Sequence, residues 1–229
     1  MVNYWDMSTL SDEIGGINLC DGLNYNFTKN RFNSPYQAIR LSNGYLKFDQ
    51  NPQLSTEFSI TAWLKVNSNK ARMEFLYFSD SNLEKNSVKI DFIDSLLHFE
   101  KTNPNLAVKS PIVVDSGVWH HLTVVVDYNR VNIYINGLMV AQKDYRSNTK
   151  NNESFMLLKY IGKTNENNYK NYADISLDEL KIFDGALKSF EVYKEFLKNG
   201  KNIFLLFILF GKKMKILFFN PKKMKTRNY

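Results

Sequence analysis

A β-hairpin signal in the middle of the chain constrains its fold most strongly. The dipeptide Asn136-Gly137 joins the β-branched run 131–135 to the apolar run 138–141. Both central residues of a type I′ turn need positive φ, which Asn and Gly tolerate best. A third run rich in β-branched residues, 118–127, precedes this pair. A chain built from such hairpins is predicted to be a β-sandwich, an architecture that usually displays a binding surface.

Alternating apolar residues and turn residues predict further strands. Residues 58–66 alternate, so one face of this strand is expected to be buried, and Trp63 on the other face needs its own cover. The other predicted strands are 38–41, 45–48, 73–78, 88–92, 96–99, 155–162 and 175–183, with a turn at 42–44 and an edge strand with long loops in 1–34. Regular short spacing between turn signals favours a sandwich or barrel over strand–helix–strand units.

One short helix is predicted near the end of the strand-rich region. Leu187, Phe190, Tyr193 and Phe196 fall on one helical face. Glu191 lies in the first turn, where the helix dipole favours a negative charge.

Size and composition allow one large all-β domain or two small ones. The chain has 229 residues, of which 44% are hydrophobic, so it can build a sizeable core. Cys20 is the only cysteine, which excludes a disulfide within the chain. A lone cysteine fits a reducing compartment, and it also fits an extracellular domain large enough to stand without bridges.

The net charge of +7 belongs to the end of the chain. Nine of the 30 basic residues and none of the 23 acidic ones follow Glu195, which leaves 21 basic and 23 acidic residues before it. This body lacks the positive surface that nucleic-acid binding requires. The first six residues contain no secretory signal, so we expect either a cytoplasmic protein or a piece of a longer one.

Residues 200–229 form a basic and apolar tail outside the predicted domain of residues 1–199. The apolar run 203–210 has eight residues, whereas a membrane-spanning helix needs about 20. The leading interpretation is unselected sequence beyond the end of the domain. The alternative is a basic amphipathic segment on an anionic membrane, which is the only membrane contact that the sequence suggests.

Several motifs in order resemble one known family. They are Tyr4-Trp5, 12–16, 30–32, 59–63, 119–122, 133–137, Ile161-Gly162 and 178–187. Together they resemble the laminin G-like branch of the concanavalin A-like lectin/glucanase superfamily, from residue 4 to about residue 199. The resemblance implies an all-β, two-sheet antiparallel jelly-roll sandwich of roughly twelve to fourteen strands with a short C-terminal helix.

The resemblance also implies a function and a location. Such domains are typically modules of larger extracellular or cell-surface proteins that bind glycans or other proteins. We therefore expect a non-catalytic recognition module that binds carbohydrate or protein through rim loops. The alternatives are a glycoside hydrolase-like enzyme and a structural spacer without a ligand.

A structural Ca²⁺ ion is the cofactor that the resemblance implies. Many relatives hold it with an aspartate in a turn after an early strand, and that position here is Ser42. The aspartate of the late strand is present as Asp178, which becomes the candidate metal ligand. Because Ca²⁺ takes six to eight oxygen ligands, several from the backbone, loss of one aspartate weakens the site.

Catalytic residues are not evident in the sequence. The glucanase relatives carry Glu-x-Asp-x-Glu on one strand, and this chain has no such pattern. Asp178 and Glu179 are adjacent, so on a regular strand they point to opposite faces, and Glu179 is predicted to lie on a solvated face. His98, His120 and His121 are predicted to be packing or surface residues.

Aromatic residues are the remaining candidates for ligand contact. The three tryptophans, Trp5, Trp63 and Trp119, are assigned to packing because they lie where the family packs its core. The candidate ligand-binding residues are Tyr145, Tyr169 and Tyr172, which are predicted to be exposed in loops rich in Asn and Lys. Aromatic rings and amides together suit sugar hydroxyls and sugar C–H faces.

Overall fold

The computed structural model describes residues 1–50, 52, 54–79, 87–102, 105–145, 158–163 and 171–198. Thirteen strands and one helix lie within these residues. They are β1 (Asn3–Trp5), β2 (Leu19–Thr28), β3 (Ala38–Phe48), β4 (Phe58–Val66), β5 (Arg72–Ser79), β6 (Ser87–Ile93), β7 (Leu96–Lys101), β8 (Leu106–Val113), β9 (Trp119–Asp127), β10 (Arg130–Ile135), β11 (Leu138–Asp144), β12 (Leu158–Ile161), β13 (Ala173–Asp184) and α1 (Ser189–Leu197).

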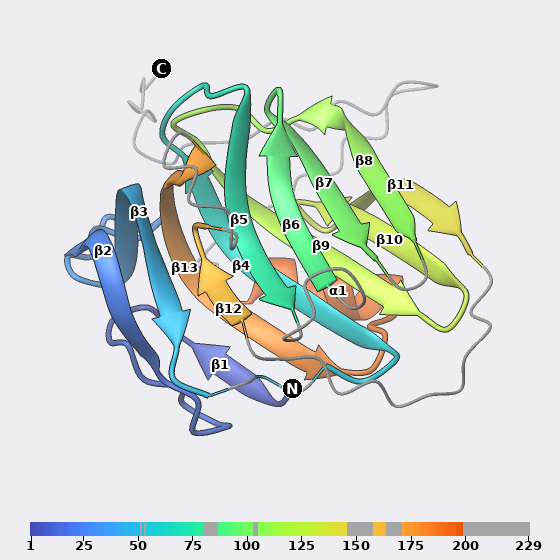
Figure 1. Cartoon of the computed structure of the whole chain (residues 1–229), viewed down its shortest axis with the longest axis horizontal. Helices are drawn as coiled ribbons and strands as arrows, with labels where there is room; N and C mark the ends of the chain where they lie inside the picture. The colour runs from blue at the N-terminus through green and yellow to red at the C-terminus, as the bar shows by residue number, and fades with distance from the viewer. Residues whose placement is uncertain are drawn as a thin grey trace, which may run out of the picture. The chain divides into compact units, whose positions relative to one another are not determined.

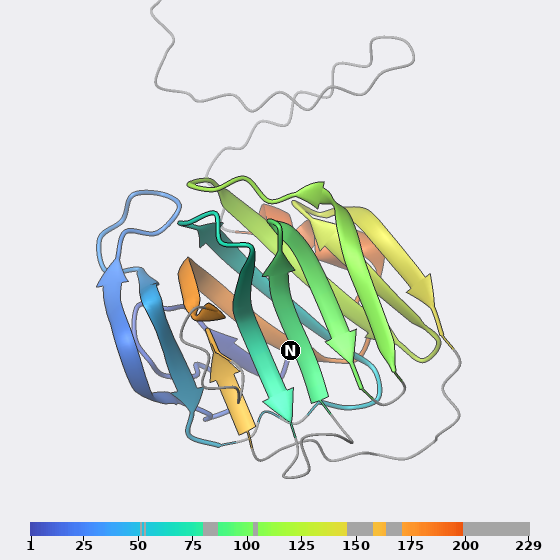
Figure 2. The same cartoon turned by 45° about the horizontal axis from the view of Figure 1, so that its top comes forward.

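The strands form the predicted two-layer antiparallel jelly roll. Hydrogen-bonded neighbours follow the order β11-β10-β9-β4-β13-β3-β12-β5-β6-β7-β8, with β1 beside β13 and β2 beside β3. In Figure 1 the layer of β12, β5, β6, β7 and β8 lies in front of the layer of β13, β4, β9 and β10. Figure 2 shows the same two layers from nearer the top.

The core fills the space between the two layers. Strand residues with alternating register point into it, which is why aromatic side chains from β3, β5, β6 and β7 are fully buried. They include Phe48, Phe78, Phe92 and Phe99. Phe48 contacts both Trp5 and Phe78, with ring centroids 5.1 and 5.7 Å apart. Each such buried side chain contributes about 1.5–3 kcal/mol of hydrophobic stabilisation.

The hairpin of β10 and β11 confirms the strongest sequence signal. Asn136 and Gly137 have φ values of +52° and +77°, as a type I′ turn requires. Ile135 pairs with Leu138 across the turn. The Asn136 side chain also accepts a hydrogen bond from the backbone amide of His121 on β9, at 2.9 Å. The turn is therefore tied to the neighbouring strand as well as to its own hairpin.

The predicted turn at 42–44 is wrong, because β3 continues through it. Asn43 has a φ of +52°, and the pairing of β3 with β13 shifts register between Ala173 and Asp174. Asn-Gly here makes an irregularity within one long strand instead of reversing the chain.

Two strands were not predicted. β2 lies in the region expected to be mostly loops, because its residues are largely exposed and carry no alternating pattern. β8 contains Pro111, which lowers the strand signal but is tolerated because β8 ends the strand order.

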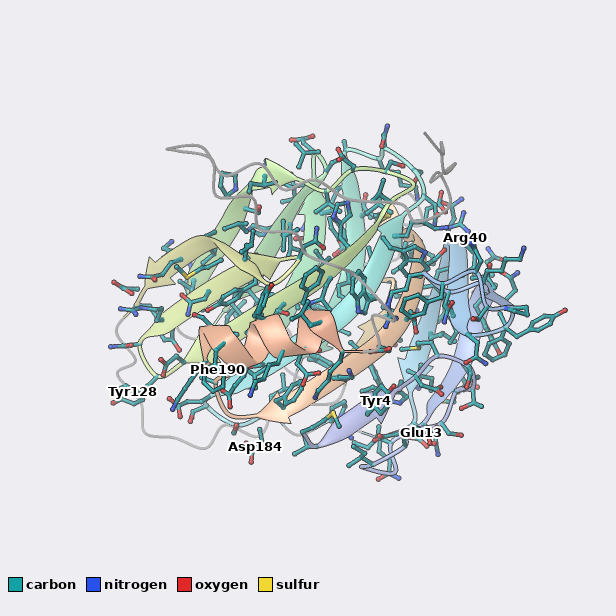
Figure 3. All side chains as sticks on the ribbon, turned by 180° about the vertical axis from the view of Figure 1, so that it is seen from behind. Tyr4, Glu13, Arg40, Tyr128, Asp184 and Phe190 are labelled. Atoms are coloured by element: carbon teal, nitrogen blue, oxygen red, sulfur yellow. The ribbon has the colours of Figure 1, made fainter. Side chains whose placement is uncertain are left out.

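Helix α1 supplies the cover that Trp63 needs. The helix lies across the outer face of the layer that contains β4 and β9 (Figure 3). Phe196 of the helix packs on Trp63 with ring centroids 5.7 Å apart, and His121 packs on the same indole at 5.3 Å. The cover expected for Trp63 is therefore confirmed.

The chain divides into two compact units, Met1–Phe196 and Leu197–Tyr229. This division falls three residues before the predicted boundary, and residues 199–229 lie outside the described part of the chain. The predictions for the tail 200–229 therefore stay predictions. Among the described residues, the chain has no helix that is both long and apolar enough to cross a bilayer.

Candidate functional site

A groove opens at one end of the sandwich, where loops from both layers meet. It has a volume of about 870 Å³ and is lined by residues 69–71, 94–95, 113–116 and 118. These residues come from the β4–β5 connection, the β6–β7 turn and the β8–β9 connection. We call it the rim groove.

Hydrogen bonds between the loops fix the shape of the rim groove. Asp94 and Ser95 form a two-residue turn with φ values of +53° and +63°. The Asp94 amide donates to the carbonyl of Ala71, and the Val114 amide donates to the carbonyl of Ser95, both at 2.8 Å. The Gly117 amide reaches the carbonyl of Val66 at 2.7 Å. The rim groove is thus held by backbone contacts among all three loops.

The side chains around the rim groove are both polar and apolar. Asp94 and Asp115 are exposed carboxylates that can accept hydrogen bonds from hydroxyl groups. Asn69 adds an exposed amide, which both donates and accepts. Val113 and Val118 are 52% and 50% exposed and provide apolar contact area. Six of the ten lining residues are polar, so the groove offers hydrogen-bonding groups beside apolar surface, as a site for a hydroxyl-rich ligand would.

Of the three predicted tyrosines, the two that the structure describes, Tyr145 and Tyr172, do not come together. Tyr145 follows β11, and its hydroxyl donates to the carbonyl of Asp127 at 2.7 Å. Asp127 ends β9, whereas the rim groove adjoins the start of that strand. Tyr145 therefore lies at the opposite end of the layer, where burial raises its pKa to about 12. Tyr169 lies outside the described residues.

Tyr172 is buried, which corrects the expectation that it is exposed. Its side chain is 3% exposed because it packs edge-to-face against Tyr45, with ring centroids 5.6 Å apart. Its backbone lies next to the rim groove, since the Lys70 ammonium donates to the Tyr172 carbonyl at 2.7 Å. Ligand binding by these tyrosines stays a prediction.

The structure adds residues around Tyr172 that sequence reasoning missed. Tyr45 and Tyr160 pack edge-to-face at 6.0 Å on the outer surface of β3 and β12. The ammonium of Lys163 lies 3.9 Å from the Tyr45 ring centroid and 4.4 Å from that of Tyr160. We call Tyr45, Tyr160, Tyr172 and Lys163 the tyrosine–lysine cluster. The available signal was the alternation Tyr45-Leu46-Lys47-Phe48, which places Tyr45 and Lys47 on the face opposite the core.

Asp178 and Glu179 bind the same arginine instead of pointing to opposite faces. Glu179 has a φ of +49°, and the pairing of β13 with β4 shifts register between Asp178 and Lys181. This bulge turns both carboxylates toward Arg31, whose two terminal nitrogens lie 2.5 Å from Asp178 and 2.6 Å from Glu179. Glu179 is 6% exposed, so the prediction of a solvated face is wrong.

The ion pairs continue from Glu179 into the space beneath α1. Lys181 lies 3.1 Å from Glu179 and 3.2 Å from Glu195 of the helix. We call Arg31, Asp178, Glu179, Lys181 and Glu195 the buried charge cluster. Burial raises the pKa of Asp178 to about 7, although the Arg31 charge acts in the opposite direction.

His121 lies beside the buried charge cluster. Its pKa is lowered to about 3 by burial, and the charge of Lys181 also lowers it. His121 therefore stays neutral at physiological pH, which fits the predicted packing role.

The surroundings of Asp178 do not fit a calcium site. The Arg31 guanidinium occupies the position in front of its carboxylate, and a divalent cation there would meet a like charge. Across the part of the chain that the structure describes, no three His, Cys, Asp or Glu side chains gather as a metal site. Calcium binding elsewhere in the chain stays a prediction.

Two other carboxylates meet on the outer face of the front layer. Glu74 and Asp91 are paired residues on β5 and β6, and both are buried. Arg72 lies 3.3 Å from Glu74 and 3.1 Å from Asp91, and Lys89 approaches both at 3.7 and 3.5 Å. His98 Nδ1 lies 2.7 Å from Asp91. No local sequence pattern predicts this arrangement, because the residues come from three strands.

This arrangement does not suit glycoside hydrolysis. Burial alone would raise the pKa of Asp91, but the hydrogen bond with His98 and the charge of Lys89 outweigh it, so the pKa is lowered. A retaining glycosidase needs an ionised carboxylate and a protonated carboxyl that both reach the substrate, whereas the side chains of Glu74 and Asp91 are 4% and 0% exposed and both are paired with Arg72. The contacts of Glu74 and Asp91 are those of a charge-balanced structural network.

The other chemically notable residues mostly pack. Trp5 and Trp63 are buried as predicted, while Trp119 is half-buried with the Lys65 ammonium 5.4 Å from its ring centroid. Burial lowers the pKa of His120. Cys20, the only cysteine of the chain, is half-buried.

Comparisons with known structures identify the fold. The binding domain of Paraclostridial Mosquitocidal Protein 1 is 20% identical with a TM-score of 0.65, and the match covers 85% of this chain and 50% of that one. The binding domain of botulinum neurotoxin DC, solved in complex with SialylT, is 18% identical with a TM-score of 0.64, covering 85% and 50%. The chain thus spans about half the length of these two domains.

A third structure matches over nearly its full length. Domain 4 of AbnA, a GH43 extracellular arabinanase from Geobacillus stearothermophilus in complex with arabinotriose, is 16% identical with a TM-score of 0.61, covering 84% of this chain and 96% of that one. Identities this low establish the fold alone. No curated protein sequence matches significantly.

The sequence itself matches a family model over residues 41–193, more than half of the chain. This match, the two-layer antiparallel sandwich and the structural neighbours agree with the resemblance seen in the motifs. The chain belongs to the concanavalin A-like lectin/glucanases superfamily.

Proposed function

We propose that this domain is a non-catalytic recognition module that binds carbohydrate through the rim groove. The observation that carries the proposal is the lining of the groove, where exposed Asn69, Asp94 and Asp115 surround the exposed apolar side chains of Val113 and Val118. Carboxylates and amides accept hydrogen bonds from sugar hydroxyls, and valine methyl groups contact the C–H face of a sugar ring.

Two structural neighbours support a sugar as the ligand. One is a domain solved with arabinotriose, and the other is a toxin binding domain solved with SialylT. We extend from these complexes only the class of ligand. A protein ligand, which the sequence also suggested, is the second outcome that the experiment below distinguishes.

The proposed location is extracellular or at the cell surface, as part of a larger protein. The relatives that share the fold include an extracellular arabinanase and toxin binding domains. In that setting glycans of cell surfaces or of polysaccharides are the accessible ligands.

The test blocks the rim groove without touching the core. Ala71 is exposed and lines the groove, so Ala71→Trp fills it, whereas Ala107→Trp places the same side chain on an exposed position of β8 outside it. Wild-type protein is screened on a glycan array that includes arabinotriose and sialylated oligosaccharides, and binding is quantified by isothermal titration calorimetry. We expect Ala71→Trp to weaken binding at least tenfold and Ala107→Trp to change it less than twofold.

Three results would contradict the proposal. Equal loss in both tryptophan variants would show that the groove is not the site. An array without any bound glycan, together with capture of a protein that Ala71→Trp abolishes, would make the ligand a protein. Release of new reducing ends from a bound glycan, abolished by Glu74→Gln, would make the domain an enzyme.

A further inference from the structure

The tyrosine–lysine cluster carries positive charge that the described residues do not balance. Lys47 follows Tyr45 by two residues and points to the same outer face of β3. Within the described part of the chain, no carboxylate lies within ion-pair distance of Lys47 or Lys163. The pKa of Lys163 is lowered by burial, and the charge of Lys47 lowers it further. Two neighbouring ammonium groups here repel each other.

Aromatic rings surround this charge. The Lys163 ammonium lies 3.9, 4.4 and 6.0 Å from the ring centroids of Tyr45, Tyr160 and Tyr172. Cation–π attraction explains why the ammonium rests there without an anionic partner. Tyr45, Tyr160 and Lys163 are half-buried, so part of each faces solvent. A ligand can therefore contact the solvent-facing parts of the tyrosine rings and the ammonium groups together.

Lys70 links the cluster to the rim groove. Lys70 lines the groove and donates to the backbone carbonyl of Tyr172, which forms the floor of the cluster. A third cationic side chain thus lies between the two surfaces. Arg40 is the neighbouring exception, because Asp174 neutralises it at 2.5 Å. An oligosaccharide in the groove can extend into the cluster.

We propose that the tyrosine–lysine cluster is a subsite for a carboxylate-bearing sugar, either a hexuronate or a sialic acid. This inference rests on the proposed function and names the class of glycan that the domain prefers. The solvent-facing parts of Tyr45 and Tyr160 can contact the apolar C–H groups of a pyranose beside the Lys163 ammonium. The carboxylate accepts charge-assisted hydrogen bonds from Lys163 and Lys47, and its charge removes their mutual repulsion.

The test compares acidic sugars with neutral partners of the same size. The two pairs are trigalacturonate with galactotriose and 3′-sialyllactose with lactose, which separate hexuronate from sialic acid. Affinities are measured for wild type, Lys163→Met, the conservative Lys163→Arg and the control Lys188→Met, an exposed lysine beside α1. We expect wild type to prefer one acidic sugar over its neutral partner by at least tenfold, because charge-assisted hydrogen bonds are the strong ones.

The variants separate binding from folding. Lys163→Met should remove the acidic preference while leaving neutral-sugar affinity within about twofold, and Lys163→Arg should retain most of it. In NMR spectra, the pKa of the Lys163 ammonium should rise when the acidic sugar binds. The control Lys188→Met should behave like wild type.

Failure of this inference differs from failure of the proposed function. Neutral and acidic sugars that bind equally, with both affinities lost in Ala71→Trp, would overturn the acidic subsite and leave the rim groove as the site. An acidic preference that survives Lys163→Met would also overturn it. Absence of binding by every sugar would overturn both proposals.

Discussion

The buried charge cluster and the tyrosine–lysine cluster both hold a lysine, but its surroundings differ: carboxylates in the first and tyrosine rings in the second. In the first, Arg31 and Lys181 meet three carboxylates, and every member is nearly inaccessible beneath α1. In the second, the Lys163 ammonium lies over the half-buried rings of Tyr45 and Tyr160, and Lys47 is on the same outer face of β3. Within the described residues, charged groups are paired with opposite charges at the first place and lie without an anionic partner at the second.

We infer from this difference that the buried charge cluster stabilises the fold, whereas the tyrosine–lysine cluster is the proposed ligand subsite. A buried charge is expensive unless it is paired, so paired charges under a helix are what structural stability demands. Cations on a half-exposed surface that have no acidic partner among the described residues add little to the stability of the fold, but they can bind an anionic ligand. The contrast between the two clusters can be tested by measuring how substitutions change the unfolding free energy and how they change ligand binding.

The largest effect is expected from Arg31→Met. This change leaves Asp178 and Glu179 without the cation that both contact, so we expect a loss of about 3–5 kcal/mol in unfolding free energy. Urea denaturation followed by tryptophan fluorescence measures it. Arg130→Met is the matched control, because Arg130 pairs with Asp144 at the surface, where solvent screens the ion pair, so a much smaller loss is expected.

The pH dependence of stability tests the same cluster. Because the pKa of Asp178 is raised from 3.8 to about 7, the folded protein holds this proton more tightly than the unfolded chain. The stability from this group is present at low pH and is lost as pH rises through about 7. The unfolding free energy of wild type minus that of Asp178→Asn should therefore fall between pH 4 and 7, at up to about 1.4 kcal/mol per pH unit. A constant or rising difference would contradict the assignment.

Two glycines with nearly the same positive φ differ in their surroundings, because one lies against α1 and the other lies in open space. Gly137 and Gly117 have φ values of +77° and +78°. A Cβ at 137 would lie 3.0 Å from the Tyr193 ring and 3.1 Å from the Phe196 ring, whereas a Cβ at 117 meets nothing within 4 Å. Gly117→Ala should cost about 1 kcal/mol from backbone strain alone, and Gly137→Ala should cost more. Equal thermal shifts in calorimetry would mean that α1 does not pack on the hairpin.

The smallest stability effect is expected at the rim groove. Val118 is half-exposed and lines the groove, so Val118→Thr should change the unfolding free energy by less than about 0.5 kcal/mol. The same variant should weaken glycan binding, because it replaces an apolar contact. A stability loss comparable with that of Gly137→Ala would make Val118 a packing residue.

Sequence reasoning worked where the signal is local. Asn136-Gly137 sets a turn through its own backbone preferences, and alternation along β4 predicts which of its residues face the core. The same alternation required a cover for Trp63, and α1 provides it. Each of these inferences needs only neighbouring residues.

Sequence-based prediction failed where side-chain positions depend on contacts between distant segments or on a single backbone irregularity. One residue with positive φ, Glu179, reverses the expected direction of its carboxylate, and Arg31 reaches it from far away in the chain. The tyrosine–lysine cluster assembles Tyr45 of β3, Tyr160 of β12 and Tyr172 from the segment just before β13. Periodicity within one strand cannot report which strands become neighbours.

The central proposal is that the rim groove and the tyrosine–lysine cluster form one glycan-binding surface. Amide chemical-shift perturbation, measured while the best glycan from the array is titrated into ¹⁵N-labelled protein, tests this most directly. The account predicts shifts at residues 69–71, 94–95, 113–118 and at Lys163. Shifts centred instead on Glu74 and Asp91, or on α1, would contradict it.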